Sequence, residues 1–197
     1  MKAVLISIHP KWVEKIANGE KTIEVRKSRP KIETPFKCYI YCTKSGKNLI
    51  KGSIACTIDF IAVNSGKVIG EFICDKITDI SVVVRNCNED YNHVYHNDEC
   101  KGSCLTWKEL QEYCNGEPLY GWHISDLKIY DNSKELSDFK KQNFCYKAGD
   151  IDNLGCWEGG CVEQELGWCD GRCSVVEKAP QSWCYVEEKQ NEQATEL

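Results

Sequence analysis

The sequence predicts a mostly β domain with a few helices, an α+β fold whose short strands form a closed or nearly closed barrel. Runs of β-branched and aromatic residues recur along the chain, and glycine, asparagine and proline separate them. Only about two segments carry apolar residues at helical spacing. A chain of 197 residues, 42% hydrophobic and 28% charged, suits one domain of ordinary size. We expect that domain over residues 1–187, followed by a disordered acidic tail at 188–197.

The chain begins with a strand, a helix and a second strand. Residues 3–8 are rich in valine and isoleucine, which is typical of a buried strand. Pro10 suits the first turn of a helix, apolar residues follow at helical spacing, and Gly19 is a natural stop. Residues 21–27 then alternate apolar and polar side chains, which predicts a strand with one buried face.

Most of the remaining elements are expected to be strands. Thr106, with Glu109 three residues later, predicts the start of a second helix, whereas residues 86–103 are polar and typical of a loop. Residues 133–141 suit a helical turn, and residues 147–178 lack periodicity. The other β-prone runs are 36–42, 54–63, 67–80, 82–84, 119–124 and 182–187.

Charge is distributed unevenly along the chain. Residues 1–67 contain 13 Lys and Arg against 5 Asp and Glu, a balance of +8, and residues 68–197 contain 12 against 25, a balance of −13. The sum of −5 argues against nucleic-acid binding over the whole surface, but a basic first third could attract a phosphate-bearing ligand. The alternative is a scattered, solvated set of charges. No apolar run suits a membrane span or a signal peptide, so we expect a cytoplasmic protein with no membrane partner.

The most informative segment is GEKTIEVRK at residues 19–27, which places three basic residues and two carboxylates at the start of a strand. Strict alternation puts Glu24 and Arg26 on one face, and Lys21 reaches that face only if the strand begins after it. Arg26 offers a planar fork to phosphate or a base edge, and Glu24 offers an acceptor or a general base. Lys21 offers a point charge or, when desolvated, a nucleophile. The alternative is a structural ion pair between Glu24 and Arg26.

The pattern G-x-K-x-x-E-x-R at residues 19–26, directly after a strand, a helix and a glycine, resembles the signature of the ASCH superfamily. Three further segments resemble strands of that family, namely GKVIGEF at 66–72, LYGWHI at 119–124 and APQSWCY at 179–185, the last as in phage- and clostridial-type ASCH proteins. The resemblance covers residues 1–145 and 178–187. It implies a PUA-like β-barrel, which residues 147–178 would interrupt as a Cys-rich insertion before the last strand.

The resemblance also implies an activity. ASCH domains are thought to bind RNA or nucleotides in a cleft beside the signature, and some members are hydrolases. One branch removes the acyl group of acetylated cytidine nucleosides with a Lys, Thr and Glu set, and others cleave RNA. Lys21 matches the lysine of that branch, whereas Glu24 stands at the position of its threonine and Thr22 lies close by. Glu71 and Glu99 are the candidates for its glutamate.

Further side chains are candidates for contact with the ligand. Trp122 could give a base a stacking surface, worth about 1–3 kcal/mol per base in single-strand binders, and the alternative is a core tryptophan. His9 ends the first strand, where it could titrate or contact phosphate. The full expected ligand set is Lys21, Thr22, Glu24, Arg26, His9, Trp122 and Ser182, with Lys21 and Glu24 as the catalytic residues if the protein is an enzyme.

The segment at 147–178 is rich in glycine and cysteine. Cys156-x4-Cys161-x7-Cys169-x3-Cys173 places four thiols within 18 residues. Four thiolates on a segment without a core of its own suit a structural Zn²⁺ site, and free thiols or a disulfide are the alternatives. A second, looser group of zinc-type ligands comprises Cys87, His93, His96, Cys100 and Cys104. The thiols expected to be small buried hydrophobes are Cys38, Cys42, Cys56, Cys74 and Cys114.

The sequence therefore predicts an ASCH protein that binds RNA, a nucleotide or a modified nucleoside in a cleft beside the GEKTIEVR segment. One alternative is a hydrolase that uses Lys21 and Glu24, either as an amidohydrolase on acylated cytidine nucleosides or as a ribonuclease. A second alternative is a phage-type regulatory module. Such a module would contact a protein partner through the acidic, Cys-rich half of the chain.

Overall fold

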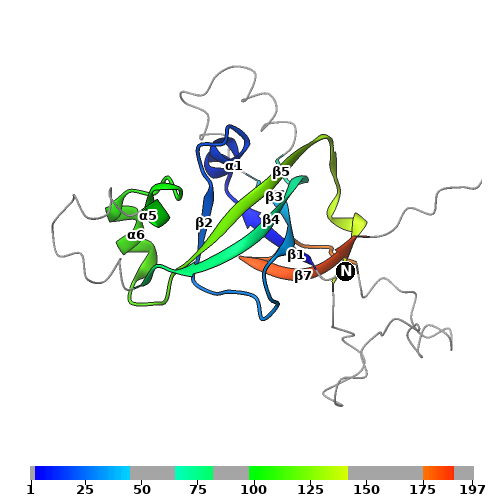
Figure 1. Ribbon diagram of the computed structural model, residues 1–197. Helices are drawn as coiled ribbons and strands as arrows, with labels where there is room; N and C mark the ends of the chain where they lie inside the picture. Colours follow the sequence, from blue (N-terminus) through cyan, green and yellow to red (C-terminus); the bar gives the residue numbers. More distant parts are fainter. Residues whose placement is uncertain (1–2, 45–64, 82–97, 142–174, 189–197) are drawn as a thin grey trace, which may run out of the picture.

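The computed structural model describes residues 3–44, 65–81, 98–141 and 175–188. Seven strands of this part form one sheet in the order β2-β5-β4-β3-β1-β7-β6. Figure 1 shows the long β4 and β5 crossing in front of β1 and β7, with α5 and α6 beside β2. The elements in chain order are β1 Ala3–Ile8, α1 Pro10–Ala17, β2 Ile23–Arg26, β3 Phe36–Cys42, β4 Val68–Asp79, α5 Asp98–Lys101, α6 Trp107–Cys114, β5 Tyr120–Lys134, η1 Leu136–Asp138, β6 Phe139–Lys141 and β7 Trp183–Glu188.

The predicted mostly β, α+β fold is confirmed. β1 lies parallel to β3 and antiparallel to β7, and the other neighbouring strands are antiparallel. We expected a closed or nearly closed barrel, and the sheet is not closed in the described residues, because β2 and β6 end the strand order without pairing with each other. The β4–β5 pairing contains three register shifts, and such bulges bend and twist a sheet. At Gly70 the strands come so close that a Cβ would lie 2.5 Å from the carbonyl oxygen of Lys128.

The core has three parts, which follow from the alternation of side chains along the strands. The main cluster receives Val4, Ile6 and Ile8 from one face of β1 and includes Trp122 and residues of α1. The second cluster receives Ala3 and Leu5 from the opposite face of β1. The third cluster lies under α5 and α6 and comprises Val25, Ile80, Cys100, Leu110, Cys114 and Leu119.

Both longer helices begin where the sequence signals predict. His9 caps α1 with Pro10 in the first turn, and Gly19 follows the helix with φ 74°. A capping box joins Thr106 and Glu109 at the start of α6, and Asn115 ends that helix in the left-handed region. These signals are local, which is why the sequence alone predicts them.

Three segments differ from the prediction. β5 continues to Lys134 because it pairs with the long β4, so the expected helical turn at 133–141 is the end of β5, the short η1 and β6. The end of the expected loop at 86–103 forms α5, and Glu188 belongs to β7 and not to the tail. The runs 54–63 and 82–84, the insertion at 147–174 and the rest of the tail lie outside the described residues.

Candidate functional site

The signature segment forms a buried chain of three charged side chains. β2 begins at Ile23, so Lys21 lies in the turn before the strand and can reach the same side as Glu24. Lys21 Nζ is 3.3 Å from Glu24 Oε2, and Glu24 Oε1 is 2.9 Å from Arg26 Nη2. The exposed fractions of the three residues are 2%, 5% and 8%. We call Lys21, Glu24 and Arg26 the charged triad.

β2 is buried on both faces, so the expectation of a half-buried strand is wrong. Val25 packs into the cluster under α5 and α6, which cover the face that would otherwise meet solvent. Glu24 lies opposite Trp122 of β5 in the antiparallel register, and paired residues project to the same face. The polar face of β2 therefore points toward the main core cluster, which contains Trp122.

The ammonium group of Lys21 is fully occupied. It donates to the carbonyl oxygens of Ser103 at 2.6 Å and Ile23 at 2.8 Å, and its third contact is Glu24. The carbonyl oxygen of Gly102 also accepts from the backbone N–H groups of Thr22 and Ile23. The turn after α5 therefore holds the start of the strand in place, and Lys21 fixes the position of Glu24.

Arg26 ties the triad to β1. Its Nη2 donates to the carbonyl oxygen of Ser7 at 2.6 Å. The backbone N–H of Ser7 donates to the carbonyl oxygen of Ser182 at 2.9 Å, and the Ser7 hydroxyl donates to Pro180. Ser182 is thus linked to the charged triad through the main chain of Ser7, which binds both Ser182 and Arg26.

Three buried polar atoms at this face have no hydrogen-bond partner among the described residues. They are Arg26 Nε, Trp122 Nε1 and Glu24 Oε2, the last of which contacts Lys21 Nζ as an ion pair at 3.3 Å but accepts no hydrogen bond. The Trp122 ring is fully buried between Phe36 and Trp183, with ring centroids 5.8 Å apart in both pairs, so it offers its N–H and not an open stacking face. The unpaired atoms therefore comprise one carboxylate oxygen and two N–H donors.

The other expected ligand residues lie at the edge of this arrangement. Thr22 is exposed and lies against Gly102, where a Cβ would come within 2.4 Å of its Oγ1. His9 Nδ1 accepts from the backbone N–H of Lys11 at 3.3 Å and caps α1. Burial, and then the charge of Lys11, lowers the pKa of His9 below its usual 6.5. The neutral ring that the cap requires is therefore the favoured form.

The stability of the protein should fall as the pH drops below about 6.5, because the unfolded chain then binds a proton that folded His9 resists. In the variant His9→Asn this dependence should weaken, since asparagine caps helices without titrating. Urea unfolding at about pH 7.5 and pH 5.5 measures the difference. Equal losses in wild type and variant would show that other groups cause the dependence.

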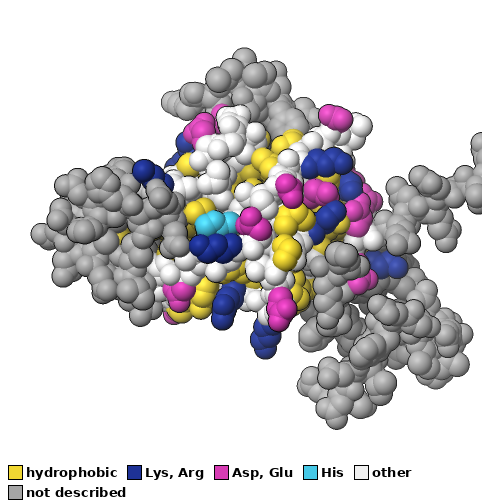
Figure 2. Space-filling view, in the orientation of Figure 1, with side chains coloured by type: hydrophobic (Ala, Val, Ile, Leu, Met, Phe, Trp, Pro, Cys, Tyr) yellow, Lys and Arg dark blue, Asp and Glu magenta, His cyan; other side chains and the backbone are white. Residues whose placement is uncertain are grey.

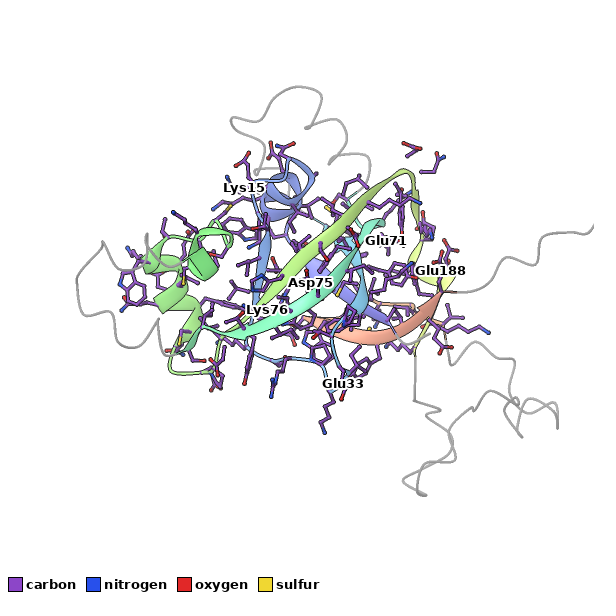
Figure 3. The ribbon with its side chains drawn as sticks, in the orientation of Figure 1. Lys15, Glu33, Glu71, Asp75, Lys76 and Glu188 are labelled. Carbon is purple, nitrogen blue, oxygen red and sulfur yellow. The ribbon has the colours of Figure 1, made fainter. Side chains whose placement is uncertain are left out.

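Glu71, one of the two candidates for a catalytic glutamate, is not brought to the charged triad. It lies opposite Tyr39, which belongs to the second core cluster, whereas Trp122 belongs to the first. Burial would raise the pKa of Glu71, but hydrogen bonds from Tyr130 at 2.5 Å and Lys37 at 3.1 Å lower it overall. Figure 3 shows Glu71 and Glu188 toward the side of the sheet away from α5 and α6. The side chain of Glu99 lies outside the described part.

Cys38, Cys42, Cys74 and Cys114 are buried, as predicted, and Cys56 lies outside the described residues. Burial raises the pKa of Cys42 to about 11 and that of Cys74 to about 12, so both stay protonated thiols at neutral pH. Within the described ranges no three His, Cys, Asp or Glu side chains are placed to hold a metal ion. Cys156, Cys161, Cys169 and Cys173 lie outside those ranges, so the zinc site stays a prediction.

The sequence reasoning missed Gly102, Ser103 and Ser7 as parts of the site. All three contribute backbone carbonyl oxygens, which carry no signal in residue type. Ser103 also has a buried hydroxyl that donates to the carbonyl oxygen of Cys100 at 2.6 Å. The one hint was the small pair Gly-Ser at the end of a polar stretch, which allows close approach of two backbones.

Comparison with known proteins identifies the family. A model described as the ASCH domain matches residues 6–154. The chain belongs to the ASCH family. This match confirms the resemblance found in the sequence. The ASCH proteins form a PUA-like fold family whose members often bind RNA. No helix within the described residues has the length and apolar character needed to cross a membrane.

Solved structures of this family resemble the chain in fold. A tyrosine-to-phenylalanine mutant of the ASCH protein from Zymomonas mobilis is 15% identical, with 95% of this ASCH chain and 91% of that chain covered at a TM-score of 0.50. The Zymomonas mobilis protein without that mutation is also 15% identical, with 94% and 87% covered at a TM-score of 0.49. No curated protein matches the chain.

Proposed function

We propose that this ASCH protein binds RNA or a nucleotide, with one base held by Glu24, Arg26 and Trp122. The observation that carries the proposal is the set of three buried polar atoms without hydrogen-bond partners. Buried polar atoms in folded proteins nearly always have a partner, and exceptions often mark sites of function. Three exceptions on two paired strands favour a shared ligand over three unrelated defects.

The chemistry of these atoms fits the edge of a cytosine. Glu24 Oε2 accepts hydrogen bonds, whereas Arg26 Nε and Trp122 Nε1 donate them. Cytosine presents an amino donor beside two acceptors, and a carboxylate is a common partner of that amino group. Uracil presents a carbonyl oxygen in place of the amino group, and this oxygen would face the Glu24 carboxylate unfavourably. The proposed site therefore prefers cytidine over uridine.

Binding at this site requires a side chain to move. The three atoms are shielded from solvent, and Trp183 packs against Trp122 while remaining partly exposed itself. The indole Nε1 of Trp183 donates to Ser28 Oγ at 3.0 Å, and its ring also packs edge-on against Tyr185 at 5.4 Å. Displacement of this ring would open a route from the surface to Trp122 and Glu24.

The contacts of Lys21 favour ligand binding over hydrolysis as the function of this site. Its Nζ contacts two carbonyl oxygens and Glu24, so these three partners leave no position on it for a substrate. The hydrolase alternative would need Lys21 as a nucleophile or Glu24 as a general base, and Glu24 is already engaged by Lys21 at 3.3 Å and Arg26 at 2.9 Å. We therefore expect nucleotide binding without turnover.

Wild type should bind CMP or cytidine more tightly than UMP or uridine in calorimetric titrations, by about tenfold for a difference of 1.4 kcal/mol. Trp122→Phe, which removes one donor without changing charge, should weaken cytidine binding, and Glu24→Gln should reduce the preference for cytidine over uridine. Glu71→Gln is the matched control, because this partly buried carboxylate lies on the other side of the sheet.

Failure of wild type to bind any nucleoside or nucleotide would overturn the proposal, as would equal affinities in wild type and both site variants. The same samples, incubated with N4-acetylcytidine and RNA, test the alternative. Acid release or RNA cleavage that disappears in Lys21→Ala would replace binding by hydrolysis as the function of this site.

A further inference from the structure

The connection from β2 to β3 begins with a cluster of exposed cations. Lys27, Arg29 and Lys31 lie within five residues, all are exposed, and none forms an ion pair with a carboxylate of the described residues. We call residues 27–31 the basic loop. Seven other described lysines each contact a carboxylate, namely Lys11, Lys15, Lys21, Lys37, Lys67, Lys108 and Lys134. The basic loop therefore differs from these lysines in having positive charge that no described carboxylate balances.

The basic loop is held firmly at its centre and end. Trp183 Nε1 donates to Ser28 Oγ at 3.0 Å, and the backbone N–H of Lys31 donates to the Tyr185 hydroxyl at 2.7 Å. Pro30, between these two contacts, is buried. Figure 1 shows this connection below the sheet, and Figure 2 shows dark-blue side chains projecting along the same edge, with magenta side chains beside them. The Lys31 contact and the buried Pro30 do not depend on Trp183, so they still restrain the loop when that ring moves, and a restrained backbone lowers the entropy that a ligand must offset on binding.

Aromatic rings accompany the cations. Lys27 Nζ lies 5.4 Å from the centre of the Tyr113 ring of α6, and the Arg29 guanidinium lies 5.6 Å from the Tyr120 ring of β5. Tyr113 is exposed, and Tyr120 is partly exposed. Cations interleaved with accessible aromatic rings are typical of proteins that bind single-stranded nucleic acid, where phosphates meet the cations and bases stack on the rings.

The basic loop also adjoins the proposed base site. It follows Arg26 directly in the chain. Trp183, which holds Ser28, packs against Trp122 with the ring centroids 5.8 Å apart. A strand whose base reaches Glu24 and Trp122 past Trp183 would lead its neighbouring phosphates onto the basic loop.

We propose that the basic loop binds the phosphate backbone of single-stranded RNA next to the base site. This inference rests on the proposed function and adds a second surface to it. The base site recognises one nucleotide, and the basic loop gives affinity for a longer strand without reading its sequence. The charged triad at the base site could not supply that term, because its cations are buried against Glu24, whereas the term comes from counterions displaced at exposed cations.

The triple variant Lys27→Gln/Arg29→Gln/Lys31→Gln tests the proposal in the full chain. The probes are a fluorescently labelled oligocytidylate of about twelve nucleotides and CMP. The variant should bind the oligonucleotide at least tenfold more weakly. The slope of log K against log salt should decrease in magnitude by about 2, because each of three lost phosphate contacts contributes about 0.7 to it. Its affinity for CMP should stay within about twofold of wild type, because the base site is intact.

A second triple variant, Lys128→Gln/Lys140→Gln/Lys141→Gln, removes the same charge from exposed positions of β5 and β6. It should retain oligonucleotide affinity, and an equal loss in both variants would overturn the proposal in favour of a diffuse charge effect. If wild type and the loop variant bind the oligonucleotide equally while CMP binding persists, the basic loop has no such role and the proposed function stands. If wild type binds neither probe, both proposals fail. Thermal unfolding of each variant verifies that it is folded.

Discussion

Replacing Glu24 by alanine is expected to lower the free energy of unfolding by about 3–5 kcal/mol, the typical cost of breaking a buried ion pair from one side. Glu24 is the only carboxylate of the described residues that contacts Lys21 and Arg26, at 3.3 and 2.9 Å. All three side chains are almost fully buried. Without Glu24, two cations would remain in the interior with no countercharge, and water would have to enter or the strand would have to open.

Urea unfolding followed by tryptophan fluorescence measures this loss. The matched control is Glu112→Ala on α6, whose contact with Lys108 is 3.9 Å long and highly exposed on both sides. That surface pair should contribute less than about 1 kcal/mol. A loss in Glu24→Ala as small as in the control would contradict the view that the charged triad is a buried, coupled unit.

A neutral replacement of the whole triad separates its structural role from its binding role. Buried ion pairs are often replaced by apolar residues of similar volume with little loss of stability. Lys21→Met/Glu24→Leu/Arg26→Met should therefore be more stable than Glu24→Ala. The same variant should not bind cytidine, since it lacks the acceptor and one of the donors. Relative to wild type, most of the stability would then be kept while cytidine binding is lost, which a purely structural triad does not predict.

The sequence predicts those parts of the fold that local signals specify. Pro10, Gly19 and the Thr106–Glu109 capping box mark helix ends through contacts within one turn, and the structure has helices at these places. The length of β5 depends instead on pairing with β4, which is distant in the chain. Alternation in the GEKTIEVR segment predicts which residues share a face, but it cannot show that α5 and α6 cover the other face.

The candidate site was predictable to a similar degree. Spacing alone indicates that Glu24 and Arg26 lie side by side, and the start of β2 at Ile23 satisfies the condition under which Lys21 joins them. The partners Ser7 and Ser103 act through carbonyl oxygens, so no residue type announces them. The sequence offers Trp122 as a stacking surface or a core residue, and its complete burial favours the core position.

Replacing Trp122 by alanine should cost about 3–5 kcal/mol of unfolding free energy, because it removes the largest fully buried side chain of the described core. The ring contacts Phe36 edge-on at 5.8 Å and Trp183 at 5.8 Å, so its loss opens a cavity between two aromatic neighbours. The shift in the urea midpoint, with an unchanged slope, measures the effect. Tyr113→Ala, at an exposed ring, should change stability by less than about 1 kcal/mol.

Trp122→Phe distinguishes packing from hydrogen bonding at the same position. A phenyl ring keeps most of the contact with Phe36 and Trp183 but lacks Nε1, the buried donor without a described partner. If Nε1 only fills space, Trp122→Phe should bind cytidine as wild type does and lose a modest part of the stability that Trp122→Ala loses. If Nε1 contacts a base, the phenylalanine variant should remain folded and lose nucleotide affinity. We expect the second result, because an unpaired buried donor has a cost that a ligand offsets.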